Sequence, residues 1–266
     1  MMASASFLSE RRRGPLSSEA ENIAANSLDF ARQGSSSSLG QESSFATSRN
    51  KLETYFDRTA MDAWARLTSD APVSGIRATV RKGRDAMHAT LMGWLPENMT
   101  GLRLLDGGCG TGTLAVEAAK RGASVVAIDV SKSLVDIARH RAPTGLDIDW
   151  QVGDMLDPRL GAFHHVIAMD SLIHYKTSDI IAAVETLRAR TSGSVVFTFA
   201  PRTPMLTVMH TAGLMFPRSD RAPAIIPVTE SKLRQHFGTS ARRGQRISSG
   251  FYKSHALEVV GEALPK

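Results

Sequence analysis

The sequence predicts an α/β fold with a mostly parallel seven-stranded sheet and helices on both faces. Short apolar stretches of strand length alternate along the chain with stretches whose apolar residues recur at helical spacing. This alternation is typical of a parallel sheet covered by helices. In addition, four glycines fall within residues 107–112, directly after the first predicted strand. Such a turn is found where α/β folds bind ligands.

The first five strands are predicted from short stretches rich in apolar residues. They are predicted at residues 102–106, 124–130, 146–153, 164–170 and 194–200. Helices are predicted between most of them, as at 114–121 and 180–190, and a short helix follows at 230–237. The last apolar segment, RISSGFYKSHALEVV, predicts a hairpin that brings the sheet to seven strands.

Three regions of different composition divide the chain. Residues 1–50 are serine-rich without apolar periodicity, so we expect a disordered extension. Its acidic residues argue against a transit peptide. Residues 51–100 predict a helical arm, with one amphipathic helix in YFDRTAMDAWARL and another over about 73–95. Residues 101–266 predict the main domain, with an irregular apolar lid at about 201–228.

Composition limits the function classes. The formal net charge is +6 and the pI is about 9.8, which permits nucleic acid, an anionic lipid or an acidic small molecule as partner. A solvated basic surface explains the same numbers. The single cysteine, Cys109, excludes an intrachain disulfide and a multi-cysteine metal site. No apolar run approaches the roughly 20 residues of a membrane-spanning helix.

The glycine turn discriminates between nucleotide-like ligands. The dinucleotide fingerprint would require a glycine at Thr113, and a phosphate-binding P-loop would require Gly-Lys-Ser/Thr, so both fail. The pattern Asp106-x-Gly108-x-Gly110-x-Gly112 instead resembles motif I of class I S-adenosylmethionine-dependent methyltransferases, which have a Rossmann-like fold. The resemblance implies that these four residues bind S-adenosylmethionine.

Further acids end the neighbouring strands, where open α/β sheets bind ligands. Asp129 ends the second strand and can accept both ribose hydroxyls. Asp154 can accept from an adenine amine while Met155 packs on the ring. Asp170 ends the fourth strand, beside the methyl-donor end of the ligand. A single acid at a strand end is often only a helix cap, but four in register with the glycines favour a cofactor site.

A basic stripe marks the second helix of the arm. Arg77, Arg81, Arg84 and His88 recur at spacings that place them on one helical face. We expect Arg77 and Arg81 to contact an anionic substrate or an anionic bilayer. The alternative is an ordinary solvated face.

Several segments together resemble one family, the magnesium-protoporphyrin IX O-methyltransferases of (bacterio)chlorophyll synthesis. The similarity runs from about Leu52 to the C-terminus. Its segments are YFDRTAMDAWARL, IRATVRKGRDAM, DGGCGTGTLAVEAAKRGASVVAIDVS, VGDM, MDSLIHY and FTFAPRTP…FPRSDRAP. The resemblance implies methyl transfer from S-adenosylmethionine to a porphyrin propionate, giving the monomethyl ester and S-adenosylhomocysteine. It also implies an arm and a lid that close over the pocket, and catalytic or porphyrin-contacting roles for Tyr55 and His174.

The residues suit this chemistry. A propionate has a pKa near that of Glu, about 4.3, and is an anion at pH 7, so it needs dehydration and alignment rather than a strong base. The apolar segment from Met205 to Phe216 can supply a dry lid or an ordinary core helix. His174 could donate a hydrogen bond, shuttle a proton or bind magnesium. Tyr175 is a weaker substrate-binding candidate that could simply pack, and Tyr55 could close over the cofactor or only hold the first helix of the arm.

Two rival functions remain at the sequence level. One is methylation of another small acceptor, such as a quinone precursor. The other is nucleic-acid binding, which the 6% aromatic content disfavours. For the main hypothesis, we expect Mg²⁺ to arrive with the porphyrin. We also expect a cytoplasmic protein with peripheral contact to an anionic photosynthetic membrane, and a magnesium-chelatase subunit as a candidate partner.

Overall fold

The computed structural model describes residues 45, 47–50, 52–55, 57, 68, 75–202 and 225–262. All of them belong to one compact unit, Ser44–Lys266. The predicted extension up to residue 44, most of the predicted first arm helix and residues 203–224 of the predicted lid lie outside the described residues. Residues 45 and 47–50, which the prediction placed in the disordered extension, are helical.

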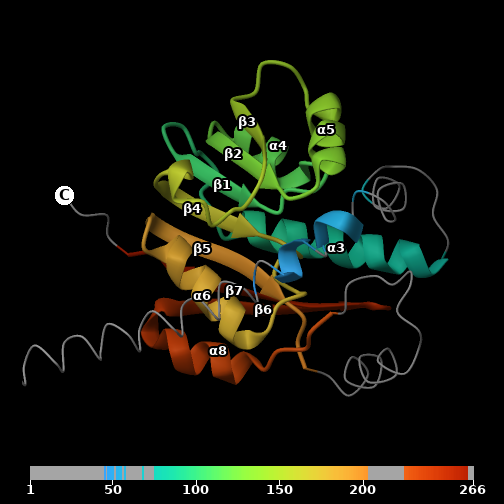
Figure 1. Ribbon diagram of the computed structural model, residues 1–266, viewed down its shortest axis with the longest axis vertical. Helices are drawn as coiled ribbons and strands as arrows, with labels where there is room; N and C mark the ends of the chain where they lie inside the picture. Colours follow the sequence, from blue (N-terminus) through green and yellow to red (C-terminus); the bar gives the residue numbers. More distant parts are fainter. Residues whose placement is uncertain are drawn as a thin grey trace, which may run out of the picture. The chain divides into compact units, whose positions relative to one another are not determined.

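A seven-stranded mixed sheet runs through the unit in the order β3-β2-β1-β4-β5-β7-β6 (Figure 1). Five parallel strands form its larger part, and the two C-terminal strands add an antiparallel hairpin against β5. The strands are β1 Arg103–Gly107, β2 Ser124–Asp129, β3 Ile148–Val152, β4 Phe163–Ala168, β5 Thr191–Phe199, β6 Ala241–Ser249 and β7 Tyr252–Val260. The predicted fold class and final hairpin are confirmed.

Helices cover both faces of the sheet. Successive residues of the central strands point to opposite sides and are apolar on both, so each face needs a layer of helices to bury it. Leu104, Val125 and Ile167 belong to an apolar cluster with α3 and α4, whereas their neighbours Leu105 and Val126 join a second cluster with α6 and α8. The helices are α3 Gly75–Gly93, α4 Thr113–Lys120, α5 Lys132–Arg141, α6 Thr177–Arg188 and α8 Glu230–Phe237. Short 3₁₀ turns, η2 Pro158–Leu160 and η3 Gly238–Ser240, complete the described elements.

Several element ends differ from the prediction by one to three residues. Strand β4 ends at Ala168, two residues early, because Asp170 adopts a left-handed φ of 55° that a strand cannot contain. Strand β5 begins at Thr191, three residues before the predicted start. The two ends of the predicted lid are held together, since Pro201 and Val228 form a parallel bridge.

Candidate functional site

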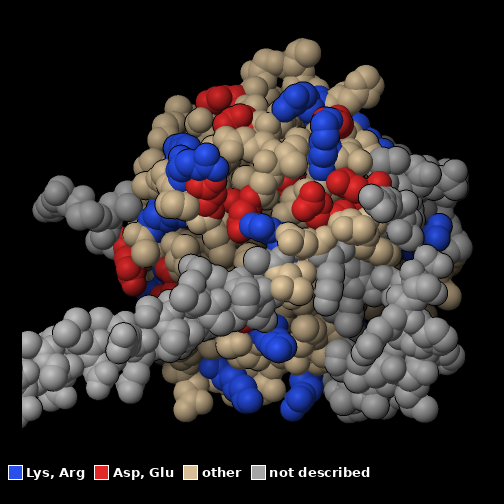
Figure 2. Space-filling model, in the orientation of Figure 1, with Lys and Arg blue, Asp and Glu red and all other residues tan. Residues whose placement is uncertain are grey.

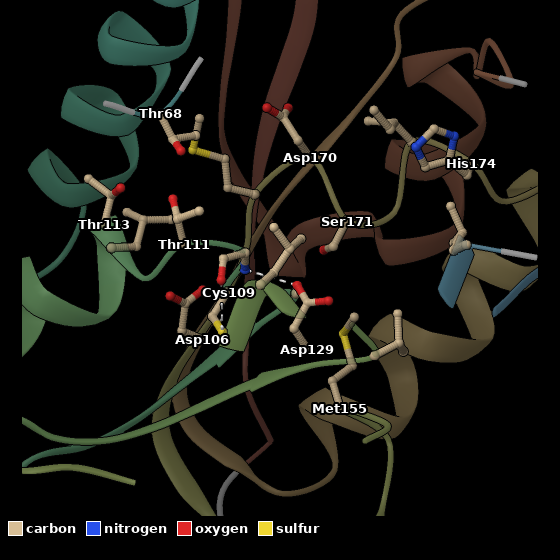
Figure 3. A pocket seen from close by; sticks show the side chains of 18 of the residues that line it. Thr68, Asp106, Cys109, Thr111, Thr113, Asp129, Met155, Asp170, Ser171 and His174 are labelled. Atoms are coloured by element: carbon tan, nitrogen blue, oxygen red, sulfur yellow. Dashed lines mark hydrogen bonds between the residues drawn. The ribbon is translucent and has the colours of Figure 1, made fainter. Parts of the chain in front are cut away.

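A cavity of about 680 Å³ opens at the carboxyl ends of β1, β2 and β4. Its walls come from the glycine turn after β1, from α3, and from described residues of the arm such as Tyr55. The position next to β1 and β4 is where the strand order reverses, the usual ligand site of open α/β sheets. Figure 3 shows Asp106 and Asp129 on either side of the turn that carries Cys109, with Asp170 and His174 at the other end of the view.

The glycine turn is pinned to the sheet by its own backbone. The N–H groups of Gly108 and Cys109 both donate to the Ile128 carbonyl, at 2.8 and 3.0 Å. Gly108 has a φ of 79°, and a Cβ there would lie 2.4 Å from the Ser171 Cβ. Gly108 therefore has no room for a side chain, because the loop after β1 passes close to the loop after β4 at this point.

Gly112 differs from the other predicted glycines. It is not among the residues that line the cavity. A Cβ at Gly112 would lie 2.4 Å from Trp150 Cη2, and its φ is 80°. The structure therefore gives Gly112 a packing role where α4 begins against β3, and its contact with the cofactor stays a prediction.

Asp129 is buried at the end of β2, and both carboxylate oxygens accept backbone hydrogen bonds. Oδ2 accepts from the Gly110 N–H and Oδ1 from the Ser131 N–H, each at 2.9 Å. Burial raises the pKa of Asp129 from its ordinary value, and these hydrogen bonds oppose that shift. The Val130 N–H also acts on this carboxylate, and since two carboxylate oxygens offer about four acceptor sites, Asp129 can still accept from a ligand.

Asp106 is the most isolated acid of the cavity wall. Its side chain is buried, and its Oδ2 has no hydrogen-bond partner among the described residues. Burial raises the pKa of Asp106 to about 7. An unpaired buried carboxylate oxygen costs free energy unless a donor reaches it, so this position fits a ligand that brings a cationic or N–H group.

Asp154 and Met155 lie at the end of β3, as predicted, but a residue missed by the sequence analysis contacts them. Arg49 Nη1 donates to Asp154 Oδ2 at 2.7 Å, while the Leu156 N–H donates to Oδ1 at 2.9 Å. Met155 packs over the turn, with its Sδ 2.8 Å from the position that a Cβ on Gly107 would take. Arg49, Asp154 and Met155 all line the cavity.

Asp170 is an anchoring residue as well as a cavity residue. Its carboxylate accepts from Arg84 Nη1 at 2.5 Å and from the Tyr252 hydroxyl at 3.1 Å, while its N–H donates to Thr198 Oγ1 at 2.7 Å. Asp170 therefore ties α3 and β7 to the end of β4. Burial raises the pKa of Tyr252, and the Asp170 charge adds to that shift. Tyr252 and Thr198 were not identified from the sequence.

The basic stripe of α3 faces the cavity. Arg77, Arg81, Arg84 and His88 all line it, which favours a role in the site over an ordinary solvated face. Arg77 is exposed at the start of the helix, whereas Arg84 is largely buried against Asp170. Burial also lowers the pKa of His88. The stripe thus runs from the solvent into the interior of the site.

The residues that follow β4 complete the wall. His174 and Ile225 line the cavity together with Tyr175. The ring of Tyr175 stacks on Phe45 with centroids 4.5 Å apart, and burial raises its pKa. Tyr175 therefore packs the helical residues around Phe45 against the main domain, and packing is the alternative role that the sequence analysis gave it. Among the described residues, no cluster of His, Cys, Asp or Glu could hold a metal ion.

Comparison with known proteins identifies the family. The model for the magnesium-protoporphyrin IX methyltransferase C-terminus matches residues 168–261, and a general methyltransferase-domain model matches 104–192. Magnesium-protoporphyrin O-methyltransferase of Rhodobacter capsulatus is 49% identical over 81% of this chain and 98% of its own length. This chain belongs to the magnesium-protoporphyrin O-methyltransferase family.

A solved family member has the same architecture. The crystal structure of magnesium protoporphyrin IX methyltransferase from Synechocystis with bound SAH superposes with a TM-score of 0.70, at 29% identity over 80% of this chain and 99% of that one. A ubiquinone biosynthesis O-methyltransferase of Methylocella silvestris is 35% identical, but over only 45% of this chain. The quinone-type relative therefore shares about half of the chain, whereas the porphyrin family shares the arm and the C-terminal strands as well. The methyltransferase belongs to the class I fold.

Within the described residues, no helix is long and apolar enough to cross a membrane.

Proposed function

We propose that this methyltransferase transfers a methyl group from S-adenosylmethionine to a propionate carboxylate of magnesium protoporphyrin IX. The products would be the monomethyl ester and S-adenosylhomocysteine. The observation that carries the proposal is the similarity to the Rhodobacter capsulatus relative, which extends over nearly the whole of that protein. An acid-lined cavity whose other wall is cationic fits both a cationic cofactor and an anionic acceptor.

The acids and glycines of the cavity fit the cofactor. The unpaired Asp106 Oδ2 suits the ammonium group of the methionine part. Asp129, whose carboxylate can accept further hydrogen bonds, suits the ribose hydroxyls, and Asp154 with Met155 suits the adenine. The missing side chains of Gly108 and Gly110 allow the ligand to approach the backbone. Asp170 would act indirectly here, since Arg84 and Tyr252 engage its carboxylate.

When bound, S-adenosylmethionine supplies an electrophilic methyl group on a sulfonium. The protein's task is to bring a carboxylate oxygen to it in line and without water. Arg77 and Arg81 line the same cavity as the acids, and guanidinium groups match carboxylates in charge and shape. We therefore assign the propionate to these two arginines, with Tyr55 and His174 as further acceptor contacts.

The role of His174 follows from the acceptor's charge. With a pKa near 4.3, a propionate is already ionised at neutral pH, so the attacking oxygen has no proton to lose. A proton shuttle is then unnecessary, and a hydrogen bond from His174 that orients the carboxylate is the role we favour. Tyr55 comes from the arm and would cover the site once the ligands are bound.

The proposal is tested with purified protein, S-adenosylmethionine and magnesium protoporphyrin IX, with ester formation followed by chromatography. We expect the monomethyl ester to accumulate together with S-adenosylhomocysteine. A catechol-type quinone precursor in place of the porphyrin provides the comparison. Turnover of the quinone precursor with no ester from the porphyrin would reject the proposal in favour of the quinone alternative.

The location of the enzyme is a further part of the proposal. The acceptor is flat, apolar and sparingly soluble, so its delivery from an anionic membrane surface or from a magnesium-chelatase subunit suits a chain of net charge +6. We therefore propose peripheral, salt-sensitive contact with the photosynthetic membrane from the cytoplasmic side.

A further inference from the structure

Asp57, in the middle of the YFDRTA segment, joins the arm to the main domain. Its Oδ1 accepts from the Ser131 hydroxyl at 2.5 Å and from the Ser133 N–H at 3.2 Å. Ser131 and Ser133 stand at the N-terminus of α5, where backbone N–H groups lack partners within the helix and a negative charge is favoured. Asp57 thus caps α5 from 74 residues away.

Ser131 connects this cap to the carboxylate that we assign to the ribose. The Ser131 N–H donates to Asp129 Oδ1 at 2.9 Å. Its hydroxyl is fully buried and also accepts from the Leu134 N–H at 3.3 Å. Ser131 therefore links Asp57 to Asp129 by hydrogen bonds. We expect the loss of Asp57 to shift Ser131 and, with it, the Asp129 carboxylate.

The same contact fixes the backbone two residues after Tyr55, whose side chain lines the cavity. The segment before Tyr55 is held independently, by the Arg49–Asp154 ion pair and by Leu52, which is buried in the main core. After Tyr55, Asp57 is the first residue with a described contact to the main domain. Asp57 itself is not among the residues that line the cavity.

We propose that Asp57 is a positioning residue for the cofactor: by capping α5 through Ser131 and Ser133, it holds Asp129 where Asp129 binds S-adenosylmethionine, and it keeps Tyr55 at the cavity wall. The inference rests on the cofactor of the proposed function and not on the acceptor. A failure of porphyrin methylation would leave it testable, because the readout is binding of S-adenosylhomocysteine.

The test is calorimetric titration of S-adenosylhomocysteine into the full-length parent and its variants. Asp57→Ala should raise the Kd about tenfold, and Asp57→Asn, which keeps an oxygen acceptor, should stay within about threefold. Ser131→Ala should also raise the Kd, and the double variant should bind no worse than the weaker single variant, because both changes break one link. Asp136→Asn is the matched control, since Asp136 lies on the exposed side of α5 and pairs with the exposed Lys132.

Hydrogen exchange gives a second readout, which separates positioning from general loss of stability. The Ser133 amide should exchange faster in Asp57→Ala than in the parent, while amides of β4 and β5 keep their protection. Parent-like affinity of Asp57→Ala would overturn the proposal. So would fold-changes for Asp57→Ala and Ser131→Ala that multiply in the double variant, or an Asp57→Asn variant as weak as Asp57→Ala.

Discussion

Asp106 sits where water does not hydrate it, so its charge state couples to folding. Its pKa in the folded protein is about 7, against an ordinary value of 3.8. Folding therefore takes up a proton between about pH 4 and pH 7. The contribution of this group to the stability of the ligand-free protein is full below about pH 4 and is lost as the pH rises toward 7.

Replacing Asp106 with the permanently neutral Asn should remove this pH dependence. The free energy of unfolding of Asp106→Asn should rise relative to the parent between pH 4 and pH 7, by at most about 4 kcal/mol. Urea unfolding of both ligand-free proteins across this range measures the difference. A difference that stays constant with pH would show that Asp106 is ionised in the folded protein at every pH tested.

Asp129 should contribute directly to cofactor affinity. Asp129→Ala removes the acceptor that we assign to the ribose hydroxyls, and hydrogen bonds to a charged group are worth about 1.5–3 kcal/mol. S-adenosylmethionine binding, measured by calorimetry, should weaken by about that amount. Unchanged affinity would mean that the carboxylate serves only Gly110 and Ser131, whose N–H groups it already accepts from.

His174 should act on the acceptor rather than on the cofactor. His174→Ala should lower kcat by roughly 10²-fold, the effect expected when the alignment of a reacting group is lost, while the Kd for S-adenosylhomocysteine stays within about twofold. His140→Ala, an exposed change on α5, is the control for effects of losing a histidine. A parallel loss of S-adenosylhomocysteine binding would identify His174 as a structural residue.

At the scale of elements, α3 forms one cavity wall only because it packs closely on β7. A Cβ on Gly83 would lie 2.5 Å from Tyr252 Cδ1, so Gly83→Ala must push the helix away from the strand. Overpacking of this kind costs about 1–3 kcal/mol. Because Tyr252 also holds Asp170, we expect weaker cofactor binding as well as a lower Tm.

The end of the same helix offers a matched control. A Cβ on Gly93 would meet no other atom within 4 Å, so Gly93→Ala should keep or raise stability by up to about 1 kcal/mol, the helix propensity gain. Thermal unfolding of the two variants measures the contrast. Equal Tm values for Gly83→Ala and Gly93→Ala would mean that α3 can move away from β7 without a loss of stability.

Elements differ in how far the sequence predicts them. The glycine turn and the acids at the ends of β2 and β3 were predicted because each is a local signal at a known position of the fold. The partners of those acids were not, since Arg49 lies 105 residues from Asp154 and Tyr252 lies 82 from Asp170. No periodicity links residues so far apart. Even the stripe on α3 was ambiguous until packing on β7 fixed which way it faces.

For the whole molecule, the net charge of +6 is not spread evenly. On the face in Figure 2, acidic side chains gather across the middle, with Lys and Arg side chains above and below them. Edge strand β6 is the most one-sided described element: Arg242, Arg243 and Arg246 are exposed, and the strand contains no acid. Arg243 forms an ion pair with Glu258 of β7. The positive charge on this edge strand also disfavours its pairing with the sheet of another molecule.

The two groups of arginines should therefore separate in function. Arg77 and Arg81 line the cavity, so Arg77→Ala and Arg81→Ala should raise the porphyrin KM, by about tenfold or more if each loses a charged hydrogen bond. Arg242→Ala lies on the edge strand and outside the cavity lining, and should leave that KM unchanged. A parent-like KM in both cavity variants would mean that the propionate is bound elsewhere.

Vesicle binding tests the contact with the membrane. Sedimentation with anionic vesicles should show binding that weakens as salt rises, and Arg242→Ala should lose up to about 1 kcal/mol of binding free energy. Salt-independent vesicle binding would contradict electrostatic contact with the membrane.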